Sequence, residues 1–125
     1  MKTPVKSMVV VLGASENPHR YAHQAAHQLI EIGYAVWLLG SRPGKISSQP
    51  ITMDWPHLDV EIHTITVYLS PERLESQLEK ICNLKPQRVI LNPGTEHDGH
   101  AQRLKTAGIA VEEACTLVLL ATGQF

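Results

Sequence analysis

Met8-Val9-Val10-Val11-Leu12-Gly13 is the stretch that decides the fold of this chain. Five apolar residues, three of them valines, run without interruption into a glycine, which is typical of a strand buried on both faces of a parallel sheet. Beyond a short segment of small and polar residues, apolar side chains recur at the spacing of an amphipathic helix, at Ala22, Ala25, Ala26, Leu29 and Ile30. Gly33 stands where such a helix would end. The chain is therefore predicted to open with a strand, a loop and a helix.

The rest of the chain continues this alternation. Further strands are predicted at residues 34–39, 63–69, 88–91 and 109–111, and the Pro- and Gly-rich loop from 41 to 58 has room for a short extra strand near Ile51. Helices are predicted after the N-cap and proline of Ser70-Pro71, over residues 98–106, and over residues 116–121. Five strands alternating with helices predict an α/β fold: one doubly wound, parallel, five-stranded sheet in three α/β/α layers, with residues 1–125 as a single domain.

Length and charge exclude several classes of protein. The chain has 125 residues and a formal net charge of -1 at pH 7, so it lacks the positive excess that drives non-specific binding to nucleic acid or to anionic membranes. No apolar run approaches the roughly 20 residues that span a bilayer, and the N-terminus lacks the apolar core of a secretory signal. Cys82 and Cys115 lie far apart, without metal-ligand spacing. We therefore expect a cytoplasmic protein with reduced thiols.

In a doubly wound sheet, ligands bind beyond the carboxyl ends of the strands. The first such loop, Gly13-Ala14-Ser15-Glu16-Asn17-Pro18, keeps only the first glycine of the dinucleotide fingerprint. Its small residues still allow a ligand to approach the backbone, and the start of a helix with Arg20 one turn in attracts anions. The loop predicts a phosphate or pyrophosphate site, with a simple turn and helix cap as the alternative.

The loop after the second strand, Gly40-Ser41-Arg42-Pro43-Gly44-Lys45, lacks the acidic residue that accepts ribose hydroxyls in NAD-binding units. Arg42, Lys45 and the hydroxyl of Ser41 instead suit a phosphate on the ribose. Such a phosphate occurs in NADP and in the adenosine part of coenzyme A (CoA). Solvated loop charges are the alternative interpretation.

Histidines form two groups in the sequence. His19, His23 and His27 repeat every four residues along one side of the first helix, but no glutamate or cysteine pattern completes a metal site, so a polar helix face is predicted. His97 and His100 are expected in a solvated loop. No pattern in the chain predicts a catalytic or metal-binding residue.

Cys115 follows a pair of acidic residues, Glu112 and Glu113. Neighbouring carboxylates disfavour a nucleophilic thiolate. We therefore predict a structural thiol or one that lines a ligand site.

Four segments follow one another in a distinctive order: Val11-Leu12-Gly13-Ala14-Ser15-x-Asn17-Pro18-x-Arg20-Tyr21, Tyr68-x-x-Pro71, Asn92-Pro93-Gly94-Thr95-Glu96, and Glu113-x-Cys115-Thr116-Leu117-Val118. Together they resemble the small stand-alone CoA-binding domain proteins of bacteria, and the resemblance covers nearly the whole chain. The fold of those proteins is similar to the CoA-binding domain of the succinyl-CoA synthetase α subunit. The resemblance implies a Rossmann-like domain that binds CoA or an acyl-CoA.

The resemblance also implies where the ligand lies. The first loop would contact the pyrophosphate, the loop after the second strand the adenosine, and the loops 68–71 and 92–94 would complete the cleft. With the residues identified above, the predicted cofactor-binding set is Gly13, Ala14, Ser15, Asn17, Pro18, Arg20, Tyr21, Gly40, Ser41, Arg42, Lys45, Tyr68, Pro71, Asn92, Pro93, Gly94 and Cys115.

The isolated members of that family have no established reaction, so the resemblance implies binding without catalysis. The alternatives are an NADP-dependent oxidoreductase and the nucleotide-binding subunit of a partner-assisted thioester enzyme. A protein partner or a homo-oligomer is compatible with each of these functions.

Overall fold

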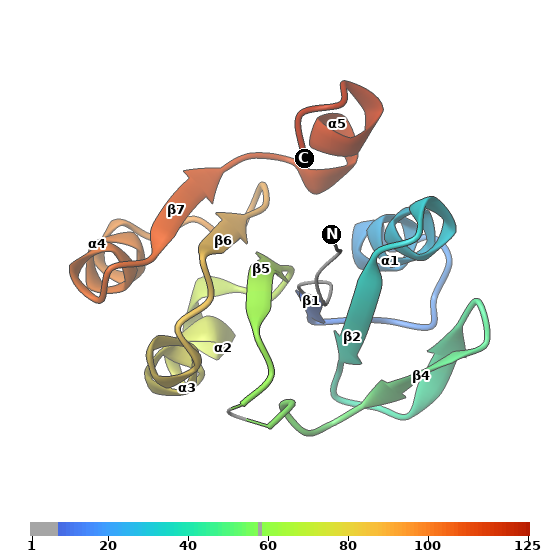
Figure 1. Ribbon diagram of the computed structural model, residues 1–125, viewed down its shortest axis with the longest axis horizontal. Coiled ribbons are helices and arrows are strands. Elements are labelled where there is room, and N and C mark those ends of the chain that lie inside the picture. The colour runs from blue at the N-terminus through green and yellow to red at the C-terminus, as the bar shows by residue number, and fades with distance from the viewer. Residues whose placement is uncertain (1–7, 58) are drawn as a thin grey trace, which may run out of the picture.

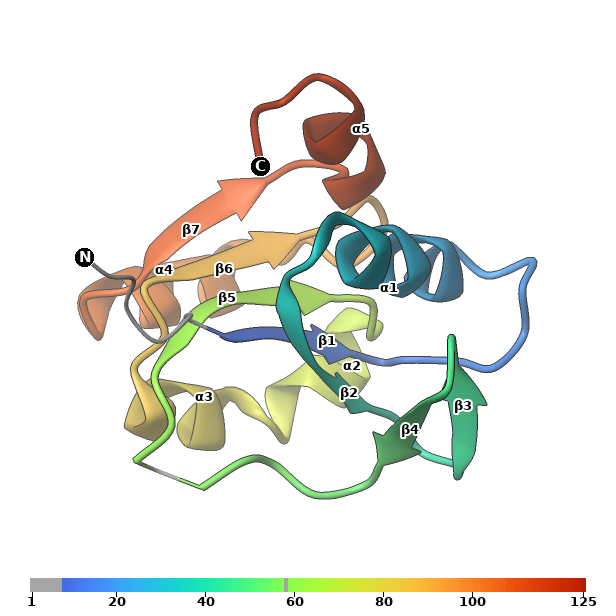
Figure 2. The ribbon, with the colours of Figure 1, turned by 45° about the vertical axis from the view of Figure 1, so that its right-hand side comes forward.

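The computed structural model of the protein describes residues 8–57 and 59–125. Within them, seven strands form one sheet in the order β3-β4-β2-β1-β5-β6-β7 (Figures 1 and 2). The strands are β1 (Met8–Leu12), β2 (Ala35–Leu39), β3 (Gly44–Ile46), β4 (Gln49–Thr52), β5 (Ile62–Val67), β6 (Arg88–Leu91) and β7 (Ala110–Glu113). All neighbouring pairs are parallel except β3 with β4. The sheet is therefore parallel-rich with one antiparallel edge.

β1 occupies the centre of the sheet, between β2 and β5. Its side chains alternate between two cores: Val9 and Val11 enter one, and Val10 and Leu12 enter the other. All four are at most 1% exposed. The unbroken apolar run is thus explained by a strand with no solvent-facing side.

Five helices cover the two faces in the described part of the chain (Figure 1). They are α1 (Tyr21–Ile32), α2 (Pro71–Glu75), α3 (Leu78–Leu84), α4 (Asp98–Thr106) and α5 (Thr116–Ala121). α1 and α5 lie on one face, and α2, α3 and α4 lie on the other. This arrangement confirms a Rossmann-like α/β fold with helices on both sides of the sheet.

The prediction of five strands is wrong, because β3 and β4 form a hairpin in the loop after β2. The extra strand near Ile51 is confirmed as β4, whereas β3 has three residues and too little pattern to recognise. The hairpin turns at Ser47 and Ser48, both with positive φ. A Ser-Ser pair gives no turn signal of the Asn-Gly kind, so the hairpin was missed.

The helix predicted after Ser70 is divided into α2 and α3. Its predicted start is confirmed: the Ser70 hydroxyl accepts from the Arg73 N–H, and Pro71 holds the first helical position. Leu74, Leu78 and Ile81 are buried on the two helices. No helix within residues 8–57 and 59–125 has both the length and the apolar character that crossing a bilayer requires.

Candidate functional site

A pocket of about 980 Å³ opens at the carboxyl ends of β1, β2 and β5. In the sheet, β2, β3 and β4 lie on one side of β1, and β5, β6 and β7 lie on its other side. The strand order therefore reverses beside β1. Such a reversal is where open α/β sheets place their ligands. Of the predicted set, ten residues line the pocket: Gly13, Ala14, Ser15, Asn17, Arg20, Tyr21, Gly40, Ser41, Arg42 and Tyr68.

Two glycines allow the loops around the pocket to pack closely. Gly13 has φ +100°, and a Cβ there would lie 3.1 Å from the Tyr68 carbonyl carbon. A Cβ at Gly40 would lie 2.5 Å from the Ala14 carbonyl oxygen and 2.9 Å from the Ile51 side chain. The loop after β1 therefore crosses the end of β2 only because neither position carries a side chain.

The loop after β1 uses some of its N–H groups internally. The N–H groups of Gly13 and Ala14 both donate to the Leu39 carbonyl, at 2.8 and 3.0 Å, and the N–H of Asn17 donates to the Ser15 hydroxyl. Within the described structure, the N–H groups of Ser15 and Glu16 have no such partner. The free donors of this turn thus lie two and three residues beyond Gly13.

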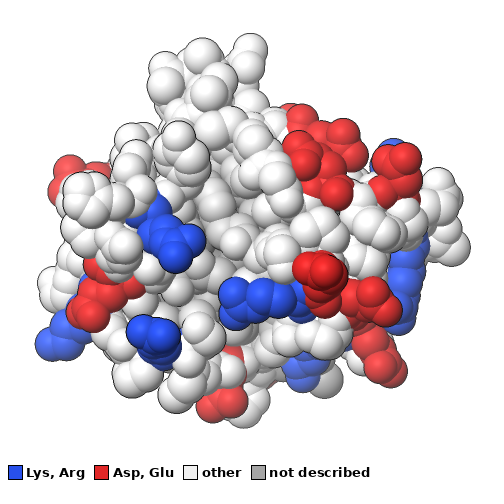
Figure 3. Space-filling view, turned by 180° about the vertical axis from the view of Figure 1, so that it is seen from behind, with Lys and Arg blue, Asp and Glu red and all other residues white. Residues whose placement is uncertain are grey.

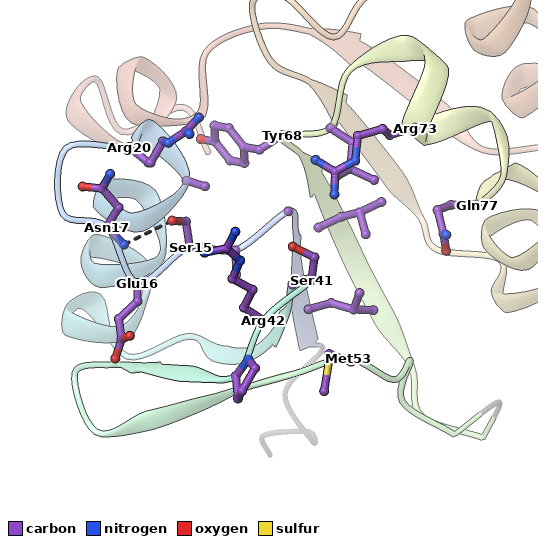
Figure 4. A pocket seen from close by; sticks show the side chains of 18 of the residues that line it. Ser15, Glu16, Asn17, Arg20, Ser41, Arg42, Met53, Tyr68, Arg73 and Gln77 are labelled. Carbon is purple, nitrogen blue, oxygen red and sulfur yellow. Dashed lines mark hydrogen bonds between the residues drawn. The ribbon is translucent and has the colours of Figure 1, made fainter.

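Three arginines line the pocket from three different segments: Arg20 at the N-cap of α1, Arg42 in the loop after β2, and Arg73 in α2 (Figure 4). In the described part of the chain, none of these guanidinium groups has an ion pair or hydrogen bond. Arg88, by contrast, donates to Thr64, Glu112 and the carbonyl of Phe125. The pocket arginines therefore present uncompensated positive charge to whatever enters.

The face of the molecule seen in Figure 3 is hollowed near its centre, and several Lys and Arg side chains border the hollow. The one acidic residue among the pocket's lining residues is Glu16, and its carboxylate accepts from the Lys45 N–H at 3.1 Å. Figure 4 shows Glu16 directed away from the opening. Lys45 lies in β3 and does not line the pocket.

The side of the pocket formed by α2 and the loop after β4 was not predicted. Met53, Trp55, Leu69, Arg73 and Gln77 line it. The indole N–H of Trp55 donates to the Gln77 Oε1 at 2.9 Å, which fixes the ring against the N-cap of α3. This side of the pocket therefore combines apolar surface with one cation. In the sequence, the residues around Trp55 give no periodic signal and Arg73 stands among Glu72 and Glu75, as on any solvated helix.

Tyr68 lines the pocket beside the turn after β1. Burial raises the pKa of its phenol to about 12. Its hydroxyl is buried, and no group of the described structure lies in hydrogen-bonding geometry with it. The phenol is therefore a neutral group at any physiological pH.

Asn92 does not line the pocket and is fully engaged elsewhere. Its Nδ2 donates to the Thr66 hydroxyl and the Val67 carbonyl, both at 2.8 Å, and its Oδ1 accepts from the Thr116 N–H at 2.8 Å. The side chain joins the ends of β5 and β6 to the start of α5. The remaining predicted residues that lie outside the pocket wall are Pro18, Pro71, Pro93, Gly94 and Cys115.

The histidines bind loops together. His23 Nδ1 contacts the Ser15 carbonyl, and His27 Nδ1 contacts the Ser47 hydroxyl, so α1 holds both the turn after β1 and the β3–β4 hairpin. The prediction of a solvated position holds for His97, which is exposed at the N-cap of α4, and is wrong for His100, which is 6% exposed within α4 and stacks on His97. The His100 Nε2 lies 2.9 Å from the Pro71 carbonyl and so connects α4 to α2.

Comparison with known proteins agrees with this geometry. The fold and the position of the pocket define a Rossmann-like α/β protein with its cleft at the switch point. A family model described as "CoA binding domain" matches residues 7–121. The chain belongs to this CoA-binding domain family. A search of curated proteins finds no significant match.

Solved structures show the same fold. A crystal structure of an uncharacterized protein is 34% identical, with a TM-score of 0.89, and the match covers 98% of this chain and 100% of the other. A Thermus thermophilus protein, cell-free ID.343, is 28% identical, with a TM-score of 0.80 and coverage of 96% and 91%. The dinucleotide-forming acetyl-coenzyme A synthetase 1 of Ca. Korarchaeum cryptofilum is 14% identical, with a TM-score of 0.71. In that case the match covers 86% of this chain but 25% of the synthetase, so it shows the fold alone.

Proposed function

We propose that this protein binds CoA or an acyl-CoA in the pocket at the ends of β1, β2 and β5, and performs no catalysis of its own. The observation that carries the proposal is the set of three unpaired arginines around a cavity of about 980 Å³, in a chain of the CoA-binding domain family. CoA carries a diphosphate and a separate phosphate on its ribose. Charge-assisted hydrogen bonds from guanidinium groups to phosphate are among the strongest that a protein side chain makes.

The turn after β1 is the proposed diphosphate site. The free N–H groups of Ser15 and Glu16 supply backbone donors there, and α1 begins close by with Arg20 at its N-cap. Arg42 approaches the same turn from the loop after β2: Figure 4 shows its guanidinium beside Ser15. The proposed diphosphate site lies in the predicted phosphate turn. Its backbone donors are the N–H groups of Ser15 and Glu16, because those of Gly13 and Ala14 donate to the Leu39 carbonyl.

The apolar side of the pocket is the proposed base site. Met53, Leu69 and the ring of Trp55 offer flat, apolar surface. The other end of the ligand, its pantetheine arm, would then extend past the turn towards Tyr68. Ligand pockets usually have volumes of roughly 300 to 1,000 Å³, so this cavity lies at the upper end of the usual range, as a long ligand needs.

Thermal unfolding with added ligands tests the proposal. A ligand that binds only the folded state at 100 times its Kd stabilises that state by about 2.7 kcal/mol, so CoA and acetyl-CoA should raise the melting temperature by several degrees. Arg20→Ala should weaken CoA binding by about 1 to 3 kcal/mol. Arg103→Gln is the matched control, because Arg103 is exposed on α4 and does not line the pocket.

NADP has the same number of phosphate groups and is the competing ligand. Adding it in parallel separates the two functions: a larger shift with NADP than with CoA would favour the oxidoreductase. No shift with either ligand would contradict both. We further propose that residues 1–125 act as one domain in the cytoplasm.

A further inference from the structure

The three pocket arginines differ in what surrounds them. Arg20 and Arg42 adjoin the turn after β1, which offers backbone donors to a diphosphate. Arg73 comes from α2, on the side of the pocket that Trp55 and Gln77 line. In Figure 4, Arg73 and Gln77 occupy one side of the opening and Arg20 and Asn17 the opposite side. The positive charge is therefore split between two ends of one cavity.

The α2 end of the pocket is built as a fixed surface. The indole N–H of Trp55 is bound to the Gln77 Oε1 at 2.9 Å, and the backbone N–H of Gln77 is bound to the Leu74 carbonyl at 2.8 Å. Leu74 is fully buried. Arg73 lies one turn before Gln77 on the same segment, and its own N–H is capped by the Ser70 hydroxyl. The backbone that carries the Arg73 side chain is thus held from both sides, and the guanidinium remains free.

Ribose chemistry connects this surface to a particular phosphate. In CoA the ribose carries the base on C1′, the separate phosphate on C3′ and, through C5′, the diphosphate. With the diphosphate at the turn after β1, near Arg20 and Arg42, and the base on Trp55 and Met53, the ribose phosphate is the anion that remains for Arg73. Resting on the proposed CoA binding, we propose that Arg73 determines specificity for ligands that carry a phosphate on the ribose, such as CoA, over those that lack it.

Binding measurements with CoA and 3′-dephospho-CoA test this assignment. Titration calorimetry would compare the wild type with Arg73→Gln, Arg42→Gln and the control Arg103→Gln. We expect Arg73→Gln to weaken CoA about tenfold, the effect of one charge-assisted bond, and to change the Kd of dephospho-CoA by less than about twofold. Arg42→Gln should weaken both ligands to a similar extent. Arg73→Lys, which keeps the charge, should recover part of the preference for CoA.

The possible failures are distinct. If Arg73→Gln weakens both ligands equally, or neither, the assignment of Arg73 is wrong while CoA binding stands. A loss confined to CoA in Arg42→Gln would transfer the role to the loop after β2 and equally contradict the assignment. If the wild type binds neither ligand, the proposed function itself fails. Melting curves of each variant without ligand show that the fold is intact, since the Arg73 side chain makes no hydrogen bond or ion pair within the described structure.

Discussion

The loop after β6 and the lining of the pocket differ in how their polar side chains are bonded. After β6, Asn92 is 2% exposed. Its amide nitrogen donates hydrogen bonds to β5, and its amide oxygen accepts one from the start of α5. Around the pocket, Arg20, Arg42 and Arg73 have no partner in the described structure. The loop after β6 and the loops that carry Arg20 and Arg42 were predicted to contact the ligand, whereas Arg73 on α2 was not. The Asn92 side chain is bonded within the fold, and the three arginines have no protein partner in the described structure.

The difference teaches how to separate motif residues that hold the fold from those available to a ligand. A buried amide with every hydrogen bond satisfied stabilises the native state and has nothing left to offer. A guanidinium that lines a cavity without a protein partner is hydrated and is free to bind an anion. The Asn92 side chain therefore joins β5 to the start of α5, whereas the arginines line the pocket.

Replacing Asn92 tests the structural half of this comparison and should have the largest effect. Asn92→Ala leaves the Thr116 N–H and the Val67 carbonyl buried without a partner. Each unsatisfied buried group costs about 1 to 3 kcal/mol, so we expect a loss of about 3 kcal/mol in the free energy of unfolding. Urea denaturation measures it. A loss below about 1 kcal/mol would show that the network is dispensable.

Asn17→Ala provides a matched control for that loss. Asn17 is exposed and its side chain accepts one hydrogen bond, from the His19 N–H. We expect this variant to lose about 1 kcal/mol or less, since a single exposed hydrogen bond within a turn is removed.

Two glycines near the pocket differ in what a side chain at their position would contact. A Cβ at Gly40 would meet the backbone oxygen of Ala14 at 2.5 Å, whereas at Gly44 it would meet the flexible side chain of Glu16 at 2.9 Å. Because backbone cannot give way as a side chain can, Gly40→Ala should cost about 2 kcal/mol and Gly44→Ala well under about 1 kcal/mol. Thermal unfolding of both variants measures the difference, and equal losses would mean that the turn after β1 is not packed against β2 as described.

The pH dependence of stability tests the burial of Tyr68 and should give the smallest effect. Burial raises the pKa of Tyr68 from 10.0 to about 12 in the folded state. Below pH 10 both states keep the proton; above it the unfolded state loses the proton first, so stability falls as the pH rises from 10 towards 12. By pH 11 the wild type should lose about 1 kcal/mol more than Tyr68→Phe. Parallel pH profiles of the two proteins in urea denaturation would contradict the buried phenol.

Much of the fold could be predicted from the sequence. β1 is recognisable because an apolar run buried on both faces leaves no polar alternation, and the start of α2 because Ser70 and Pro71 act locally. The β3–β4 hairpin could not be predicted, since β3 is short and its turn uses two serines with positive φ. Only the tertiary burial of Ile46 and Ile51 makes it a stable edge.

The pocket could be predicted in part. Sequence alone located the loops after β1 and β2, because topology fixes where strands end. It missed Arg73, whose helix looks solvated in sequence, and it included Lys45, which lies on β3 outside the pocket wall. It also placed Asn92 in the predicted binding set, although Asn92 does not line the pocket, because no sequence pattern reveals that its side chain makes three hydrogen bonds within the fold. Such distinctions depend on contacts between residues 24 to 26 positions apart.

The measurement that tests the central claim most directly is the affinity for CoA of the wild type and of a triple variant, Arg20→Gln, Arg42→Gln and Arg73→Gln combined. Titration calorimetry should show binding by the wild type and by Arg103→Gln, and a loss of at least about 100-fold in the triple variant, with its melting temperature unchanged without ligand. A triple variant that binds CoA as well as the wild type, or a wild type that does not bind it, would contradict the claim that these three unpaired arginines form the binding site.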